Sequence, residues 1–199
     1  AVDYCDSYLS HVKGIGDRLN FVLSKTNKIL SLKKYDNLFK NKILPIFNFQ
    51  FKGLNKNFNN QIIKNKYKSS DYILSPSDFG FHNIIIKDKK CYFIDFEYSG
   101  FDDPHKLILD FICQPDFYLT KEKKNFFIKT FIYKFHNYNI SKKLIYYLEP
   151  FYRIKWCCIM LNKYLNEENF YYNQNKNFTT FHNDYTKINN YYKTYIKKY

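Results

Sequence analysis

The spacing of hydrophobic and polar residues predicts helices for the first third of the chain. Residues 3–32 carry apolar side chains three or four positions apart, the period of a helix with one buried face. Gly14 and Gly16 predict a bend or a division in this helix. A second helix is expected over about 34–44, ending near Pro45, because proline cannot donate a backbone hydrogen bond.

The pattern changes in the middle of the chain. Tyr72–Leu74 is expected to form a short strand, and two runs rich in β-branched and aromatic residues, Ile84–Lys87 and Cys91–Asp95, are typical of a β-hairpin. Helices resume at Pro104, and Asp103 before it suits the N-cap position. The remaining helices are predicted over about 104–114, 121–137, 141–148, 151–167 and 180–197.

Polar stretches connect these elements. Residues 52–60 are predicted to be a loop or the start of a helix, a short helix is expected to end near Lys68, and residues 171–180 are predicted to be a connection. The pattern as a whole predicts an α+β fold that is mainly α, with a small central β-hairpin.

Composition narrows the class of protein. At 199 residues and 45% hydrophobic content the chain has the size of one domain with a substantial core. The net charge of +14 is typical of proteins that bind nucleic acid. Only Arg18 and Arg153 are arginines, however, and because proteins that recognise bases and phosphates favour the guanidinium group, this composition argues against nucleic-acid binding. The five cysteines lack a paired spacing, which favours reduced thiols and a cytoplasmic location. No apolar run predicts a membrane span or a membrane partner.

Residues 74–107 gather the polar side chains that point to chemistry. Asp78 and Asn83 are spaced D-x-x-x-x-N on the loop before the first hairpin strand, and Asp95 ends the second strand. Because a hairpin brings the entry of one strand beside the exit of the next, these three side chains are expected to converge. One amide and one carboxylate suit Mg²⁺, which prefers oxygen ligands and keeps sites for water or phosphate. The remaining carboxylate can accept a proton from a hydroxyl.

The segment "SPSDFGFHNIII…YFIDFEYSGFDDPHKLILDF" resembles the catalytic centre of the aminoglycoside phosphotransferase and choline kinase family, which has a protein-kinase-like fold. The resemblance implies that Asp78 is the catalytic base and that Asn83 and Asp95 bind Mg²⁺ and, through it, the nucleotide. It also implies supporting or acceptor-side positions for Ser77, Glu97 and Asp110. Pro76 and Ser77 stand where the family usually has His and Gly.

By this resemblance residues 1–199 form one kinase-like C-terminal lobe, with the catalytic and metal centre at 74–111 and a helical acceptor-side subdomain at about 117–199. The implied activity is transfer of the γ-phosphoryl group of ATP, or of GTP, to the hydroxyl of a small molecule. The chain contains no G-x-G-x-x-G, so the N-terminal lobe that clamps the nucleotide is expected to be absent and the chain alone to be weakly active or inactive. The resemblance does not specify which small molecule accepts the phosphoryl group.

Each of these residues also has a structural interpretation. Asp78 and Asn83 could stabilise a turn, Asp95 and Glu97 could be solvated residues at a strand end, and Asp103 is best explained as a helix cap. His82 is predicted to pack in the loop, and His105 to be an exposed residue of a first helical turn. Two other functions are retained as alternatives: a kinase-like binding module without catalysis, and a basic nucleic-acid-binding protein.

Overall fold

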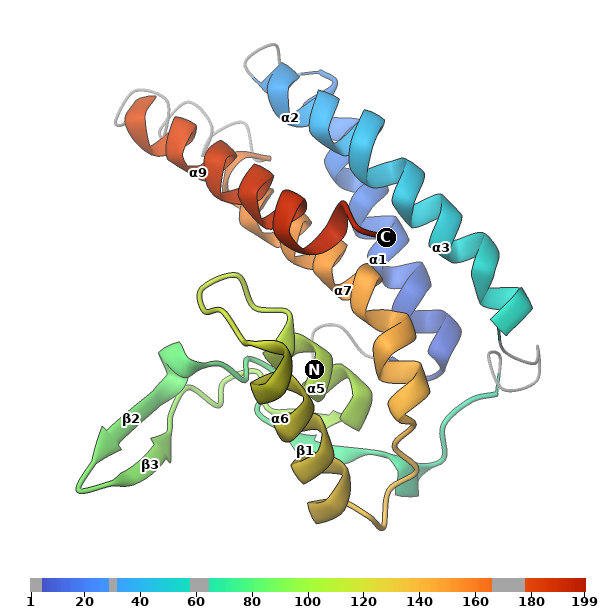
Figure 1. Cartoon of the computed structure of the whole chain (residues 1–199), viewed down its shortest axis with the longest axis vertical. Coiled ribbons are helices and arrows are strands. Elements are labelled where there is room, and N and C mark those ends of the chain that lie inside the picture. The colour runs from blue at the N-terminus through green and yellow to red at the C-terminus, as the bar shows by residue number, and fades with distance from the viewer. Residues whose placement is uncertain (1–4, 29–31, 58–64, 166–177) are drawn as a thin grey trace. The chain divides into compact units, whose positions relative to one another are not determined.

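The computed structural model describes residues 5–28, 32–57, 65–165 and 178–199 (Figure 1). Helices dominate, and the strands form two separate two-stranded antiparallel sheets. The predicted α+β class, mainly α, is therefore confirmed. The chain divides into two compact units, the first comprising residues 1–11 and 61–149 and the second residues 12–60 and 150–199.

The first unit contains both sheets. Strand β1 (Ile73–Ser75) pairs with β4 (Gly100–Asp102), and β2 (Ile84–Lys87) pairs with β3 (Lys90–Phe93). The predicted hairpin is thus present, closed by two residues, Asp88 and Lys89, that both have positive φ. Such a two-residue turn matches the twist of the flanking strands. Strand β4 was not predicted, because three residues of sequence Gly-Phe-Asp show no alternation and are fixed only by pairing with β1.

Helix α5 (Pro104–Ile112) forms the centre of this unit, and every one of its residues is buried. Its start is as predicted: Asp103 is the N-cap, and its side chain accepts a hydrogen bond from the backbone N–H of His105. Helix α6 (Lys121–Lys134) is capped in the same way by Thr120. The ring of Phe127 on α6 lies 4.4 Å from that of Phe111 on α5, which joins the two helices through aromatic packing.

The second unit is helical. Helix α1 (Tyr8–Thr26) continues through Gly14 and Gly16, so the predicted division is wrong. Gly16 has a packing role, because a β-carbon there would lie 3.0 Å from the ring of Phe47. The ring of Phe47 in turn meets that of Phe151, so a small residue at position 16 lets α1 approach this aromatic pair.

The helix predicted to end near Pro45 continues past it. Helix α2 (Lys33–Leu38) leads through a wider π-helical turn at residues 39–43 into α3 (Leu44–Asn57). The π turn lies directly before Pro45, where the proline ring removes one N–H and crowds the preceding turn. Local widening of the helix therefore accommodates the proline. Of residues 52–60, predicted to be a loop or the start of a helix, those up to Asn57 belong to α3.

The two helices predicted at 141–148 and 151–167 are one helix, α7 (Lys142–Leu161), with Pro150 inside it. Pro150 costs the helix one backbone hydrogen bond, but its neighbours Leu148, Phe151 and Ile154 are all fully buried. Tertiary packing of this face outweighs the local penalty, as it does for most helices in folded proteins.

The chain ends in α9 (Phe178–Tyr191) and a π turn at residues 192–196. In the second unit α9 is held to α7 by Arg153, which is buried, donates to the hydroxyl of Tyr191 and packs on the ring of Tyr195. The predicted connection at 171–180 falls mostly outside the described residues, as does most of the short helix expected before Lys68. Within the described residues no helix combines the length and apolar character that crossing a bilayer requires.

Candidate functional site

The loop that carries Asp78 begins with a strained turn directly after β1. The backbone N–H of Asp78 donates to the carbonyl of Pro76 over 2.8 Å, which closes a three-residue turn centred on Ser77. Ser77 has a φ of 62°, and its own N–H donates to Oγ of Ser75. Turns of this kind with a positive central φ are rare, and strain in folded proteins gathers at functional positions.

Asn83 closes the loop from the other end. Its side chain is buried, and Nδ2 donates to the backbone carbonyl of Asp78 over 3.0 Å. Since the amide nitrogen is used inside the loop, the amide oxygen Oδ1 is the atom left to accept a donor or bind a cation. The D-x-x-x-x-N spacing therefore folds into one closed loop, with Asp78 at its start and Asn83 at its end.

Asp95 lies beside this loop along the backbone. The N–H of Ile94 donates to the carbonyl of Asn83 over 3.0 Å, so the residue before Asp95 pairs with Asn83 at the base of the hairpin. Asp95 itself is exposed and has a φ of 63°. The expected closeness of strand entry and strand exit is present in the backbone, and the roles of the three side chains remain predictions.

His82 contacts the candidate base. Its Nε2 lies 3.1 Å from Oδ2 of Asp78, and both side chains are nearly half exposed. His82 thus packs within the loop, as the sequence predicted, but its partner Asp78 was not predicted. The spacing of four residues could have suggested the pair only if the intervening segment had been recognised as a tight loop. The other carboxylate oxygen of Asp78, Oδ1, has no hydrogen-bond partner among the described residues.

Sequence reasoning also missed two residues that support the loop. Gln114, which is buried just beyond α5, donates from Nε2 to the carbonyl of Phe79 over 3.1 Å. Gly80 lies against it, and a β-carbon at Gly80 would come within 2.2 Å of Gln114 and 2.6 Å of His82. The rings of Phe79 and Phe81 both pack on Phe111 of α5. The loop is thereby fixed to the buried helix.

The three supporting candidates fall in different surroundings. Ser77 is the centre of the strained turn, and its Oγ is buried without a hydrogen-bond partner among the described residues. Glu97 is exposed and forms a hydrogen bond with Tyr98, which raises the pKa of that phenol. Asp110 is buried on α5, where its carboxylate lies 3.5 Å from the ammonium of Lys106. Lys106 also pairs with Asp102 at 2.5 Å.

His105 is buried, contrary to the prediction of an exposed residue. Its Nε2 accepts a hydrogen bond from the backbone N–H of Ser141, so Nδ1 carries the ring proton and donates to Oδ1 of Asp103 over 2.8 Å. The other oxygen of Asp103 receives hydrogen bonds from His11 and from the hydroxyl of Tyr67. Asp103 is thus a helix cap, as predicted, and also the centre of a buried network that ties together distant segments.

The pKa values of two groups in this network, His11 and Asp103, are strongly shifted. Burial alone would lower the pKa of His11, but Cys5 and Asp103 beside it outweigh that effect and raise the pKa to about 10. Burial alone would raise the pKa of Asp103, but His105 and His11 hold it well below its usual range. His11 and Asp103 therefore form a buried ion pair at neutral pH.

Among the described residues no group of three or more His, Cys, Asp or Glu side chains is placed to hold a metal ion. The magnesium site predicted from the sequence needs only two protein ligands, one of which is an amide. These are Oδ1 of Asn83 and the carboxylate of Asp95. These are hard oxygen donors, and two protein ligands suit Mg²⁺ when substrate phosphates and waters supply the rest. Asn83 and Asp95 therefore carry the donor atoms that the magnesium prediction requires, and magnesium binding stays a prediction.

Comparison with protein-family models, with curated proteins and with solved structures finds no match to this chain.

Proposed function

We propose that this chain is the metal- and acceptor-binding part of a phosphotransferase that moves the γ-phosphoryl group of ATP or GTP to a hydroxyl of a small molecule. The observation that carries the proposal is the closed loop in which Asn83 bonds the backbone of Asp78 and pairs with the residue before Asp95. The likeness of this segment to aminoglycoside and choline kinases supports the same assignment. The proposed location is the cytoplasm, since all five cysteines are free thiols.

In this proposal Asp78 orients the acceptor. Its carboxylate is partly exposed, and the contact with His82 uses Oδ2, so Oδ1 is free to accept the proton of a hydroxyl as that oxygen attacks phosphorus. Asn83 and Asp95 would hold Mg²⁺, which supplies positive charge for the phosphate oxygens. The fixed loop contributes positioning, which is a large part of catalysis in phosphoryl transfer.

The hairpin offers a surface for the nucleotide base. Ile85 and Tyr92 lie opposite each other in the ribbon and therefore share one face, and both are about half exposed. The other face is different, because Phe93 packs on Phe79 of the loop. An exposed aliphatic and aromatic pair beside Asn83 suits a flat heterocycle, whose phosphates would then lie toward the loop.

The first test is metal-dependent nucleotide binding by the chain as it stands. Two-dimensional NMR should show ATP shifting the signals of Asn83, Ile85 and Asp95 only when Mg²⁺ is present, with a Kd of about 1 mM because these 199 residues contain no G-x-G-x-x-G loop to cover the phosphates. Asp95→Asn should weaken the binding about tenfold, whereas Asp88→Asn, an exposed aspartate in the hairpin turn, should leave it unchanged.

Absence of any metal-dependent shift at up to about 10 mM nucleotide would overturn the proposal. Binding that remains intact without turnover, when a panel of hydroxyl acceptors and a complementary nucleotide-clamping lobe are supplied, would assign the chain to a kinase-like binding module instead. Tight, salt-sensitive retention on duplex DNA or on RNA would favour the nucleic-acid alternative.

A further inference from the structure

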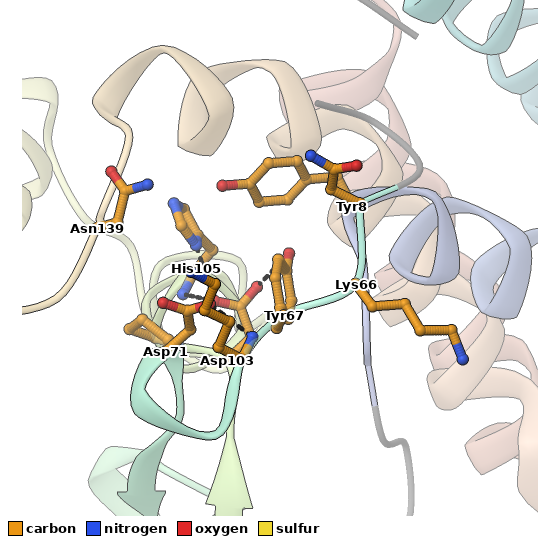
Figure 2. A pocket seen from close by; sticks show the side chains of 10 residues that line it. Tyr8, Lys66, Tyr67, Asp71, Asp103, His105 and Asn139 are labelled. Atoms are coloured by element: carbon orange, nitrogen blue, oxygen red, sulfur yellow. Dashed lines mark hydrogen bonds and ion pairs between the residues drawn. The ribbon is translucent and has the colours of Figure 1, made fainter. Parts of the chain in front are cut away.

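A cavity lies in the first unit (Figure 2). It has a volume of about 340 Å³, near the lower end for small-molecule sites. Its walls come from Tyr8 at the start of α1, from Tyr67 and Asp71 before β1, and from Asn139 before α7. Asp103 and His105 form its floor. Four segments distant in sequence thus meet around one cavity.

The cavity and the Asp78 loop lie at opposite ends of the β1–β4 pair. Ile73 and Asp102 are partners at the end next to Asp71 and Asp103, which line the cavity. Ser75 and Gly100 are partners at the other end, from which the Asp78 loop departs. A ligand in this cavity would therefore be separate from the proposed transfer site, and the inference that follows does not depend on that function.

The polar atoms of Asp103 and His105 already form hydrogen bonds within the protein. Both oxygens of Asp103 are occupied, by His105 on one side and by His11 and Tyr67 on the other. Both ring nitrogens of His105 are used as well, since Nε2 accepts from Ser141. These buried groups cannot turn toward a ligand without losing hydrogen bonds. They hold the walls in place.

Two polar atoms in the walls, the hydroxyl of Tyr8 and Oδ1 of Asp71, are available to hydrogen-bond a ligand. Within the described residues the hydroxyl of Tyr8 has no hydrogen-bond partner, and in Figure 2 it points toward the side where His105 and Asn139 lie. Asp71 accepts the backbone N–H of Lys68 with Oδ2 and keeps Oδ1 for another donor. The rings of Tyr8 and Tyr67 meet edge to face at 5.2 Å.

Two lysines, Lys66 and Lys68, line the cavity together with Asp71 and Asp103, but at the Tyr8 hydroxyl the two aspartates dominate. Burial and the carboxylates of Asp103 and Asp71 raise the pKa of Tyr8 to about 12. The ammonium of Lys66 is engaged by Asp6 at 3.1 Å, and its side chain extends away from the cavity in Figure 2. A positive charge placed beside the Tyr8 hydroxyl would therefore be attracted, whereas most of the surface repels cations because the net charge is +14.

We propose that this cavity binds a primary ammonium group carried by a small aliphatic molecule. The ammonium donates to Oδ1 of Asp71 and to the hydroxyl oxygen of Tyr8, and it lies near the aromatic rings of Tyr8 and Tyr67, which attract cations. Asn139 receives the polar group at the far end of the ligand. The ammonium belongs either to a diamine or to an amino acid, and the two sources differ in that far group.

The test is titration of the whole chain, by NMR in an amine-free buffer of low ionic strength, with three probes of the same length. These are 1,4-diaminobutane, 4-aminobutanoate and 1,4-butanediol. The two amines should bind with a Kd of about 1 mM or lower, and the neutral diol at least about tenfold more weakly. Tighter binding of the diamine or of the amino acid identifies the source. Equal binding of the diol, or no amine binding by about 10 mM, would refute the site.

Substitutions in the cavity test whether the amine binds there. Asp71→Asn keeps an oxygen for the Lys68 N–H but removes the charge, and Tyr8→Phe keeps the ring but removes the hydroxyl. Each should weaken amine binding at least about fivefold, with an unchanged circular dichroism spectrum. The matched controls Asp88→Asn and Tyr133→Phe change exposed residues outside the cavity and should bind within twofold of the unaltered chain, about the scatter for neutral surface changes. If both cavity variants behave like the controls, the amine binds elsewhere and the proposal fails.

Discussion

Nε2 of His82 lies 3.1 Å from Oδ2 of Asp78, so an imidazole holds one oxygen of the carboxylate proposed as the base. This contact fixes which oxygen is left for the acceptor. Asp78→Ala should therefore abolish turnover in an active assembly, by a factor of about a thousand or more, while leaving the fold intact. His82→Ala should lower kcat by about tenfold with little change in nucleotide binding, because it affects orientation and leaves the base in place.

Steady-state kinetics and thermal unfolding of both variants check this prediction, with Asp88→Asn as the control for loss of an exposed carboxylate. A normal kcat for Asp78→Ala would rule out the assignment of Asp78 as the base.

Glycine at position 77 should make the protein more stable than the native serine does. Its φ of 62° is unfavourable for a residue with a β-carbon, and its buried Oγ lacks a partner among the described residues. Ser77→Gly should raise the free energy of unfolding by about 1 kcal/mol, and Ser77→Val should lower it by about 2 kcal/mol because β-branching adds strain at positive φ. Urea unfolding of the two variants measures the difference, and a stabilising valine would show that the turn is not strained.

The Asp78 loop should loosen when its support is overfilled. In Gly80→Ala the new β-carbon would lie within 2.2 Å of Gln114, so either the glutamine or the loop must move. We expect a loss of about 1–3 kcal/mol, as for other overpacked positions, and faster hydrogen exchange at the N–H of Asn83. Gly14→Ala is the matched control, because a β-carbon there meets nothing within 4 Å and alanine favours the helix. Equal stability of the two variants would contradict the role of Gln114.

Stability should depend on pH through His11. Its pKa is raised from 6.5 to about 10 in the folded protein, so folding binds the proton more tightly. This contribution is complete below about pH 6.5 and is lost as the pH rises from 6.5 toward 10. Asp103 has a lowered pKa, so its contribution is lost only as the pH falls below about 3.8. The free energy of unfolding at pH 9 should be lower than at pH 6 by more than about 1 kcal/mol.

The same measurement on His11→Gln should show a lower stability at pH 6 and a much flatter profile. His136→Gln changes an exposed histidine and should keep the profile of the unaltered chain. An unchanged slope in His11→Gln would mean that other groups cause the pH dependence.

The sequence predicted the elements whose signals are local. The hairpin followed from two β-branched runs around Asp88 and Lys89, and the start of α5 followed from Asp103 before Pro104. The errors arose where packing outweighs local preference. A helix was expected to end near Pro45, and two helices were expected at 141–148 and 151–167, but a π turn accommodates Pro45 and a buried face stabilises the continuous helix around Pro150.

The candidate site shows the same division. Asp78 and Asn83 were found because their spacing is a local pattern, and the loop that they close is observed. Gln114 could not be found, because its hydrogen bond to Phe79 joins residues 35 positions apart. His105 was predicted to be exposed for the same reason, since the segment that covers it, around Ser141, is 36 positions away. Contacts of that range leave no periodic signal in the sequence.

The ribbon formed by β2 and β3 has both edges unpaired within the described residues, and it carries Ile86 mostly exposed and Tyr92 about half exposed. Such an edge is a template on which another extended chain can add as a strand. Concentrated solutions of this protein should therefore self-associate through the hairpin, and charged substitutions at its outermost isoleucine should improve the yield of monomer.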